Sequence, residues 1–520
     1  MPEVKEIVIP FPVGGIVQNR GYHDQPEGTT PDAKNIWPFQ WESGRGRGGV
    51  RPGRSEEIGP DGDVRGWCNA NYYSGGTKTG IACATSSGCW YHEDGFDDGV
   101  GSDWIEKIET ACLSDFGSCA VFDGRLIQTS LTNTYPLWVL LDTPGPGTAI
   151  NDADSPENCG LVAVWNGRVF LAGVSIAPNT LYASKVGSFH QANDWDTTET
   201  GAGAAYSNAG DDVGQISEPI TSLIPHNRDC FLVGCVDSIY VIRGNPKSGG
   251  QIYRLSDESG PVMNTAWCKD SADNTWILTR QGLSRIPSGC GQPPESVSKS
   301  VIPNELVGLD PGVSNAKYSL VYEDRFQGIH IIGWTGSEPL AWFYDLQAGG
   351  FWRQEYAQSG SSANQVQVGW DFPSVSSTSR GSCVLANFGT DCWIMDTSDD
   401  TEEIDSYLWL GPIPVGEPNQ QGIMHSIMAT LAEESGDIAW SVYIADSAQE
   451  AFNQDVDPGV TVAPDFTGEN WDRGGLNFEQ YPRLRGSVFY LKLEDVSNST
   501  WSIEEITTKI TALSKRRVEE

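Results

Sequence analysis

The chain has 520 residues, with 33 Lys and Arg against 69 Asp and Glu, so its formal net charge is -36. General electrostatic binding of DNA needs clustered cations that release counterions, and a chain this acidic is excluded from that class. Hydrophobic residues make up 38% of the chain, which excludes wholesale disorder, and its 59 glycines indicate many tight turns.

Residues 1–60 are predicted to form an extended N-terminal arm. Prolines and glycines recur through it, and they remove backbone donors and permit close approach of backbones. The cationic cluster of the arm consists of Arg45, Arg47, Arg51 and Arg54. In an acidic chain we expect these arginines to pair with carboxylates across a subunit boundary. Contact with phosphate and a merely solvated loop are the alternatives.

Residues 61–397 repeat a short β-rich run, a polar turn and another β-rich run. Asp123-Gly124 and Asn166-Gly167 have the composition of tight hairpin turns. They lie 43 residues apart, from position 123 to position 166, which matches the ~40–50 residues of a four-stranded propeller blade. Because one blade cannot bury both its faces alone, the repeats predict an all-β fold, a β-propeller of six or seven four-stranded blades. A pair of β-sandwiches with coincidental turn spacing is the alternative.

Residues 398–520 differ from the repeats in their pattern of charged, apolar and polar residues. The run 396–405 holds six carboxylates and no base, which predicts a solvated linker. Beyond it, stretches such as 438–444 and 485–493 alternate apolar and polar residues, as half-buried antiparallel strands do. The pattern predicts a second, smaller C-terminal antiparallel β domain, with a short helix opened by a capping box at 446–449.

The residues that bind metals in proteins are present but poorly spaced. None of the 12 cysteines form a CxxC pair, and no two of the six histidines lie at ligand spacing from each other, so neither a metal site nor a cofactor is predicted. Many cysteines lie in apolar runs and are predicted to be buried, reduced thiols, with disulfides as the alternative outside a cell. The acidic loop 93–103 does not match the spacing of the twelve-residue Ca²⁺ loop.

Catalytic and membrane-spanning motifs are also missing from the sequence. It has no GxSxG elbow, P-loop or HExxH, and with 69 acids some pair of carboxylates always looks eligible for glycoside hydrolysis. We therefore predict that the chain is not an enzyme. No apolar run approaches the ~20 residues that cross a bilayer, and the first residues do not read as a secretory leader. No membrane anchor is expected.

Motifs in the arm carry a resemblance to a known family. They read Phe11-Pro-x-Gly-Gly, Pro31-Asp-Ala-x-Asn35-Ile-x-Pro and Arg45-Gly-Arg-Gly-Gly-x-Arg-Pro-Gly53. Further matching text lies at 181–187, 194–196, 411–413, 436–440 and 498–503. In this order and combination, the chain resembles the β-propeller tail nozzle, or tail hub, proteins of short-tailed bacteriophages. The resemblance is scattered along nearly the whole length.

The resemblance implies a virion protein of the tail, made in the bacterial host cytoplasm. Such a protein assembles as a ring, usually of six copies, beneath the portal and tail adaptor proteins, with tail fibre or spike proteins as further partners. The ring closes the tail channel and lets double-stranded DNA out on infection. The arm residues that we single out as subunit-interface candidates are Phe11, Pro12, Gly14, Gly15, Arg20, Pro31, Asp32, Asn35, Arg45, Arg47, Arg51 and Arg54.

The charge of the chain fits such a conduit. Negative charges within a Debye length of ~8–10 Å repel the phosphate backbone, so DNA would slide through without sequence-specific binding. The competing hypothesis is a carbohydrate-binding or carbohydrate-cleaving propeller acting on host surface glycans, which the 19 tryptophans and the surplus of acids would serve. A protein-interaction propeller is disfavoured, because only Trp195-Asp196 places a Trp-Asp pair where a blade would end.

Overall fold

A computed structural model gives the fold of the chain. It describes residues 4–40, 48–73, 77–78, 80–93, 104–110, 117–143, 147–150, 154–208, 215–258, 260–289, 291–356, 368–372, 382–386, 391–396, 404–413, 415, 420–456, 463–496 and 500–515. The arginines at positions 45 and 47, the loop 94–103 and most of the run 396–405 lie outside the described residues.

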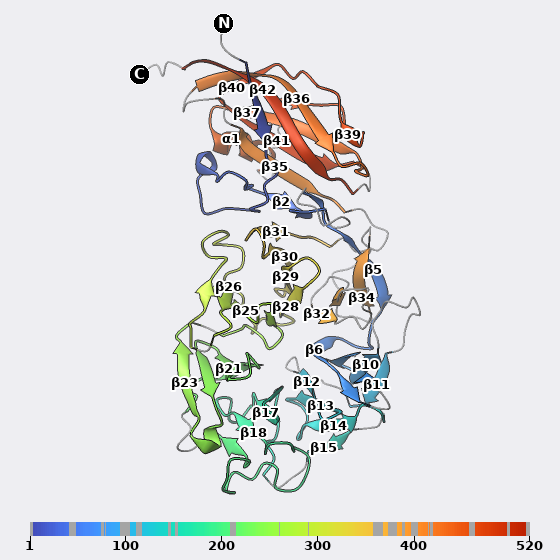
Figure 1. Ribbon diagram of the computed structural model, residues 1–520, viewed down its shortest axis with the longest axis vertical. Coiled ribbons are helices and arrows are strands. Elements are labelled where there is room, and N and C mark those ends of the chain that lie inside the picture. The colour runs from blue at the N-terminus through green and yellow to red at the C-terminus, as the bar shows by residue number, and fades with distance from the viewer. Residues whose placement is uncertain are drawn as a thin grey trace.

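Seven four-stranded antiparallel sheets of the described residues are arranged around a ring, and this confirms the predicted β-propeller (Figure 1). Blade one contains β6 (Val64–Asn69), β9 (Gly80–Thr85), β10 (Cys89–Glu93) and β11 (Ile105–Ile108). Blade two contains β12 (Gly117–Phe122), β13 (Arg125–Ser130), β14 (Leu137–Leu140) and β15 (Thr148–Ala149). Blade three contains β16 (Leu161–Trp165), β17 (Arg168–Ala172), β18 (Tyr182–Ala183) and β19 (Tyr206–Ser207). Blade four contains β20 (Ile220–Ile224), β21 (Cys230–Cys235), β22 (Ile239–Arg243) and β23 (Gln251–Ser256).

The remaining blades complete the ring. Blade five contains β24 (Trp267–Lys269), β25 (Thr275–Thr279), β26 (Gly282–Ile286) and β27 (Glu295–Ser296). Blade six contains β28 (Lys317–Glu323), β29 (Gly328–Trp334), β30 (Pro339–Asp345) and β31 (Phe351–Arg353). Blade seven contains β32 (Val368–Phe372), β33 (Ser382–Ala386), β34 (Asp391–Asp396) and β5 (Gly53–Ile58). Short pairs outside the blades are β3 (Ile36–Trp37) with β4 (Gly49–Val50), and β7 (Tyr72–Tyr73) with β8 (Thr77–Lys78).

Blade seven is built from two distant parts of the sequence. Its outermost strand, β5, comes from the end of the arm and pairs antiparallel with β34, with Arg54 opposite Met395. A strand from before blade one thus completes the last blade. Pairing the segment before blade one with the last blade closes the ring and covers the edge of β34. The predicted boundary at residue 60 therefore falls beyond a strand that belongs to the propeller.

The C-terminal domain is a sandwich of two five-stranded sheets, as the alternating pattern predicted a second β domain. One sheet contains β1 (Val4–Ile9), β42 (Ile503–Lys515), β36 (Gln420–Leu431), β39 (Gly475–Leu476) and β40 (Leu484–Gly486). The other contains β2 (Ala33–Lys34), β35 (Tyr407–Ile413), β41 (Val488–Asp495), β37 (Ile438–Ala445) and β38 (Phe466–Thr467). The predicted short helix is α1 (Ala448–Val456), where the Ser447 hydroxyl accepts a hydrogen bond from the Glu450 amide at 3.2 Å.

The arm contributes strands to this sandwich. Strand β1 pairs with β42 and strand β2 pairs with β35, so the arm adds one strand to each sheet. Figure 1 accordingly places the N and C ends of the chain at the same end of the molecule. Two single turns of 3₁₀ helix, η1 (Tyr22–Asp24) and η3 (Pro246–Ser248), lie in the arm and in the β22–β23 connection.

One hydrophobic core runs from the propeller through the arm into the sandwich. It contains buried tryptophans from all three parts, among them Trp37 in the arm, Trp352 in blade six and Trp440 in the sandwich. The Trp37 ring stacks on Phe343 of blade six with centroids 4.5 Å apart. Domains move relative to each other by default unless their interface is large and hydrophobic. A shared core of this kind fixes the propeller and the sandwich as one body.

The cysteines follow the expectation of buried thiols with one correction. Seven described cysteines are thiols, and all but Cys68 are buried. Cys230, buried at the start of β21, is disulfide-bonded instead. Its apolar surroundings made a reduced thiol the expected state, but burial alone does not select between a thiol and a disulfide.

Candidate functional site

The glycines of the first arm motif lie against the outer strand of blade six. The amide of Ile16 donates to the carbonyl of Phe351 at 2.8 Å. Gly15 has φ of +71°, and a Cβ added there would lie 2.7 Å from the backbone nitrogen and oxygen of Phe351. Nearby, the Phe11 ring stacks on Trp352 with centroids 6.1 Å apart. The motif is therefore an intramolecular docking segment that needs glycine for its backbone conformation and for close approach.

The second arm motif ends in a buried asparagine that joins three parts of the chain. Asn35 has a positive φ of 58°. Its Oδ1 accepts hydrogen bonds from Nε of Arg51 at 2.9 Å and from the Glu355 amide at 2.7 Å. Its Nδ2 donates to the carbonyl of Asp405 at 2.8 Å. One side chain thus connects the arm, the segment after blade six and the segment that enters the sandwich.

Arg51 is enclosed by its own chain, with 1% of its surface exposed. Its Nη1 donates to the carbonyl of Pro52 at 2.8 Å, and its Nη2 donates to the carbonyl of Glu355 at 2.7 Å. The guanidinium also lies over the Tyr356 ring, 4.5 Å from its centroid. The planar fork of arginine matches these separate acceptors, whereas lysine offers only a point charge.

Arg54 belongs to a buried charged group between blades six and seven. It is 2% exposed, and its Nη2 lies 3.9 Å from Oε2 of Glu323. The same carboxylate oxygen accepts a hydrogen bond from Nε2 of His330 at 2.6 Å. Burial by itself would raise the pKa of Glu323, but the hydrogen bond from His330 and the nearby positive charges outweigh it and hold that pKa below its usual value. Burial lowers the pKa of His330, so the ring is neutral.

The other arm candidates divide between buried and exposed positions. Pro12 and Pro31 are buried, and Gly14 is half-buried. Oδ2 of Asp32 accepts a hydrogen bond from the Tyr407 hydroxyl at 2.8 Å, and burial raises the pKa of this carboxyl group. Arg20 is exposed. The structure therefore gives Arg51 and Arg54 partners within one chain, whereas the pairing expected of the arginines at positions 45 and 47 lies outside the described residues. Exposed Arg20 stays a candidate for a subunit interface.

The propeller axis holds a cavity of about 440 Å³ lined by the first strands of the blades. Its described lining is largely apolar, and it contains one lysine, Lys269, and no arginine. Burial lowers the pKa of Lys269. A cavity of this size suits a small molecule. It is far too small for a DNA duplex, whose major groove alone is about 12 Å wide. DNA therefore cannot pass along this axis.

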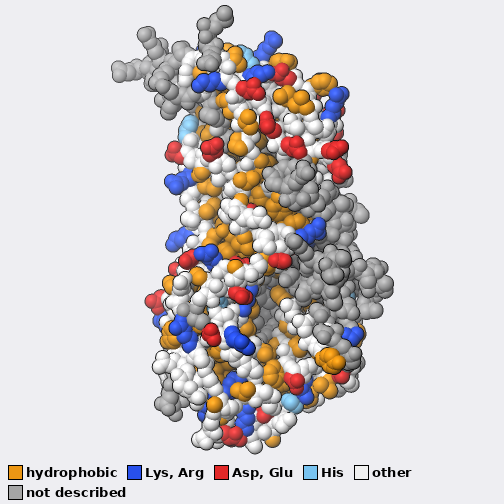
Figure 2. Space-filling view, in the orientation of Figure 1, with side chains coloured by type: hydrophobic (Ala, Val, Ile, Leu, Met, Phe, Trp, Pro, Cys, Tyr) orange, Lys and Arg blue, Asp and Glu red, His pale blue; other side chains and the backbone are white. Residues whose placement is uncertain are grey.

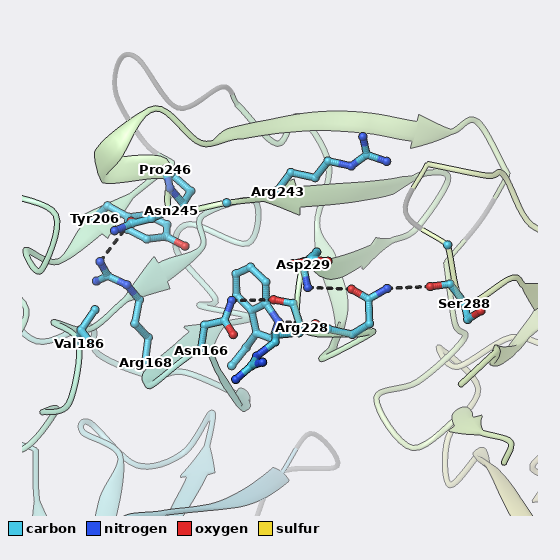
Figure 3. A pocket seen from close by; sticks show the side chains of 14 residues that line it. Asn166, Arg168, Val186, Tyr206, Arg228, Asp229, Arg243, Asn245, Pro246 and Ser288 are labelled. Atoms are coloured by element: carbon cyan, nitrogen blue, oxygen red, sulfur yellow. Dashed lines mark hydrogen bonds between the residues drawn. The ribbon is translucent and has the colours of Figure 1, made fainter. Parts of the chain in front are cut away.

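A second hollow lies where blades three, four and five meet, and we call it the arginine-lined pocket (Figure 3). Its volume is about 710 Å³. Blade three supplies the end of β16, the start of β17 and part of β19, blade four supplies its β20–β21 and β22–β23 connections, and blade five supplies the segment after β26. The lining side chains that carry charge are Arg168, Arg228, Arg243 and Asp229. Each comes from a turn or a strand end.

One arginine of the pocket is structural. Arg168 is buried, and its guanidinium donates to the carbonyls of Ala204 at 2.8 Å and Ala202 at 2.9 Å and to Oδ1 of Asn245 at 3.2 Å. Burial lowers its pKa. The guanidinium also lies over the ring of Tyr206, 5.2 Å from its centroid. Figure 3 shows Arg168, Tyr206 and Asn245 together at one end of the pocket.

Sequence reasoning missed two clusters of reactive side chains. The first is the arginine-lined pocket, whose members are spread over three blades. The second is a set of thiols between blades one and two, where hydrogen bonds from Cys68 and Cys89 lower the pKa of Cys119. Among the described residues, no group of three or more His, Cys, Asp or Glu side chains is placed to hold a metal ion. No described helix is long and apolar enough to cross a membrane.

Comparison with known proteins gives distant structural likeness alone. No protein-family model and no curated protein matches the chain. Two solved extracellular domains of hybrid two component systems from B. thetaiotaomicron are similar to it. The first is 10% identical with a TM-score of 0.40, and the match covers 73% of this chain and 45% of that one. The second is 12% identical with a TM-score of 0.41, over 76% of this chain and 46% of that one. The match spans less than half the length of each of the two solved structures, and it carries no conclusion about function.

Proposed function

We propose that this chain is a structural subunit of the tail nozzle of a short-tailed bacteriophage. The observation that carries the proposal is the role of the arm. The motifs that resemble this family are the same residues that dock the arm on blade six and join it to the sandwich, through Gly15 and Asn35. They make the propeller and the sandwich one rigid body, which is what a subunit that holds a channel in shape requires. The role is structural and needs no catalysis.

In this proposal the DNA channel lies between copies of the chain. The cavity on the propeller axis is too small for a duplex, so the propeller wheel is not itself the conduit. Each copy adds a formal charge of -36 to the ring. In the view of Figure 2, acidic and basic side chains are interspersed over both the propeller and the sandwich. A wall of net negative charge repels the phosphate backbone at short range and lets DNA slide.

The proposed partners and location follow from the same resemblance. Copies of the chain would form the ring, usually of six, below the portal and adaptor proteins, with fibre or spike proteins attached around it. The chain would be made in the host cytoplasm and would leave the cell in the virion. Exposed Arg20 in the arm is the described candidate for a contact with a neighbouring copy.

The proposal is tested on phage particles purified from a lysate in which the chain is produced. Quantitative mass spectrometry counts its copies per particle, and gold-labelled antibody against the chain locates it. We expect the copy number of one ring, with label at the tail. Absence from the particles, or label over the capsid, would overturn the proposal. Negative-stain images of the purified chain add an independent check, because the proposal expects rings with a central hole.

A further inference from the structure

We propose that the arginine-lined pocket binds an acidic saccharide, with a sugar carboxylate held between Arg228 and Arg243. The pocket has about 710 Å³, which is the size of a small-ligand site. Three arginines and one aspartate line it, although the chain as a whole carries twice as many acids as bases. This binding site does not depend on the virion role, because it lies within one chain.

The two arginines are available for a ligand. Arg228 follows β20 and Arg243 ends β22, and both side chains are exposed. Figure 3 shows them on opposite sides of the pocket, Arg243 above and Arg228 below in that view. Arg168, in contrast, already donates to four acceptors of its own chain. The Arg243 guanidinium lies over the Tyr253 ring, 5.6 Å from its centroid, and this contact with the face of the guanidinium leaves its edge N–H groups for a ligand. Guanidinium forks bind carboxylates through two parallel hydrogen bonds, which gives both affinity and orientation.

Other lining groups suit the hydroxyl groups of a sugar. Tyr206 is 3% exposed, and among the residues that the structure describes its hydroxyl has no hydrogen-bond partner. A buried hydroxyl normally has a partner, so this group is satisfied when a ligand supplies one. The carboxylate of Asp229 adds an acceptor beside the arginines. A ligand that carries both a carboxylate and hydroxyl groups uses all of these side chains.

The same lining disfavours two simpler ligands. A neutral sugar usually stacks on an exposed aromatic face, but Trp165 is buried against Phe170 and Phe231, and its indole N–H donates to the carbonyl of Asn227 at 2.7 Å. An inorganic phosphate ion would fill only a small part of a cavity of about 710 Å³, and it carries few O–H groups for the acceptors of the lining. Arg228 and Arg243 therefore supply the affinity for an acid. Tyr206 and Asp229 select an acid that also carries hydroxyl groups.

The test measures binding of defined oligosaccharides to the purified full chain by isothermal titration calorimetry. The probes are oligosaccharides that carry galacturonate, glucuronate or sialate, each paired with its carboxyl-reduced counterpart, and inorganic phosphate. We expect at least one acidic probe to bind at least tenfold more tightly than both its reduced counterpart and phosphate. Failure of all three acidic probes to bind, equal binding of the reduced counterpart, or tighter binding of phosphate would each overturn the proposal.

Variants locate the binding. Arg228→Gln and Arg243→Gln change exposed side chains, so both are expected to fold, and each should weaken binding of the acidic probe at least tenfold. Tyr206→Phe should weaken it severalfold. Arg280→Gln is the matched control, because Arg280 is an exposed arginine in the β25–β26 turn, at the opposite end of β26 from Ser288 of the pocket. Unchanged binding in both pocket variants, or an equal loss in the control, would contradict this site even if the chain is a virion protein.

Discussion

The side-chain oxygen of Asn35 accepts a hydrogen bond from Nε of Arg51 at 2.9 Å, inside the junction between the propeller and the sandwich. The two residues are 16 positions apart, so the pair joins two parts of the arm. The backbone repeats the connection, since the Arg51 amide donates to the Asn35 carbonyl at 2.9 Å. Several predictions about stability depend on this junction and on the strand that follows it.

Replacing Arg51 by lysine is expected to destabilise the chain by about 3 kcal/mol. Lysine keeps the charge but cannot reach Asn35, Pro52 and Glu355 together, and it leaves buried acceptors without donors. Urea unfolding measures the change in the free energy of unfolding. Arg20→Lys, at an exposed position of the same arm, should change it by less than about 0.5 kcal/mol. Equal effects of the two substitutions would contradict the role given to Arg51.

Gly15→Ala is expected to destabilise the chain more than Gly28→Ala. Both glycines have positive φ, +71° and +74°, so both substitutions strain the backbone by about 1 kcal/mol. A Cβ at position 15 also meets the backbone of Phe351 at 2.7 Å, whereas nothing lies within 4 Å of a Cβ at position 28. The difference, which we expect to be about 2 kcal/mol or more, isolates the cost of separating the arm from blade six. Thermal unfolding with matched calorimetry checks it, and equal losses would rule out a tight contact.

Strand β5 is expected to exchange its amide hydrogens as slowly as the strand it pairs with. As part of blade seven, residues 53–58 should exchange at least about 100-fold more slowly than an unstructured peptide, like β34. The two-residue strands β7 and β8, which pair only with each other, serve as the internal comparison and should exchange faster. Hydrogen–deuterium exchange with mass spectrometry resolves these peptides. Rapid exchange of 53–58 would show a free arm instead of a closing strand.

The Glu323–His330 pair is expected to make the chain less stable as the pH falls below about 6.5. The pKa of His330 is lowered in the folded chain, so only the unfolded chain takes up this proton as the pH drops below the usual value of 6.5. The pKa of Glu323 is lowered too, so the ionised carboxylate stabilises the folded chain at pH values above the usual pKa of 4.5. This stabilisation is lost as the pH falls from 4.5 through the lower pKa of the folded chain. Both contributions have the same sign, and denaturant unfolding at several pH values between 4 and 8 measures their sum.

Two variants assign that pH dependence. His330→Gln keeps an N–H donor for Glu323 but does not titrate, and it should flatten the stability profile between pH 5 and 6.5. Glu323→Gln removes the buried negative charge beside Arg54 and should cost about 3 kcal/mol at neutral pH. An unchanged profile in His330→Gln would mean that other histidines, such as buried His226, set the pH response.

The repeats were predictable because hairpin chemistry is local. Asp123 and Gly124 have φ of 49° and 69°, and Asn166 and Gly167 have φ of 48° and 72°, as the predicted turns require. Residues Phe122 and Arg125 pair across the first turn, and Trp165 and Arg168 pair across the second. Each turn therefore joins the first two strands of a blade, and their spacing is the length of one blade. No tertiary information was needed for this part of the fold.

The partners of the arm were not predictable in the same way. Prolines, glycines and arginines indicated an extended segment that is ordered by contacts, but a spacing pattern does not say which surface provides the contacts. The acceptors of Arg51 include a residue 304 positions away, and Arg54 lies beside a carboxylate on β28. From the sequence we expected both arginines to pair across a subunit boundary, and the structure places them inside the chain.

The sequence by itself determined the features that depend on neighbouring residues. These are the strands, the hairpins, the count of six or seven blades, and the change of sequence pattern that marks the second domain. Tertiary structure alone decided that seven blades close with a strand from the arm, that the arm completes both sheets of the sandwich, and that arginines from blades three and four face one pocket. These contacts join residues far apart in the chain, and their free energy comes from burial and hydrogen bonds that exist only once the ring has closed.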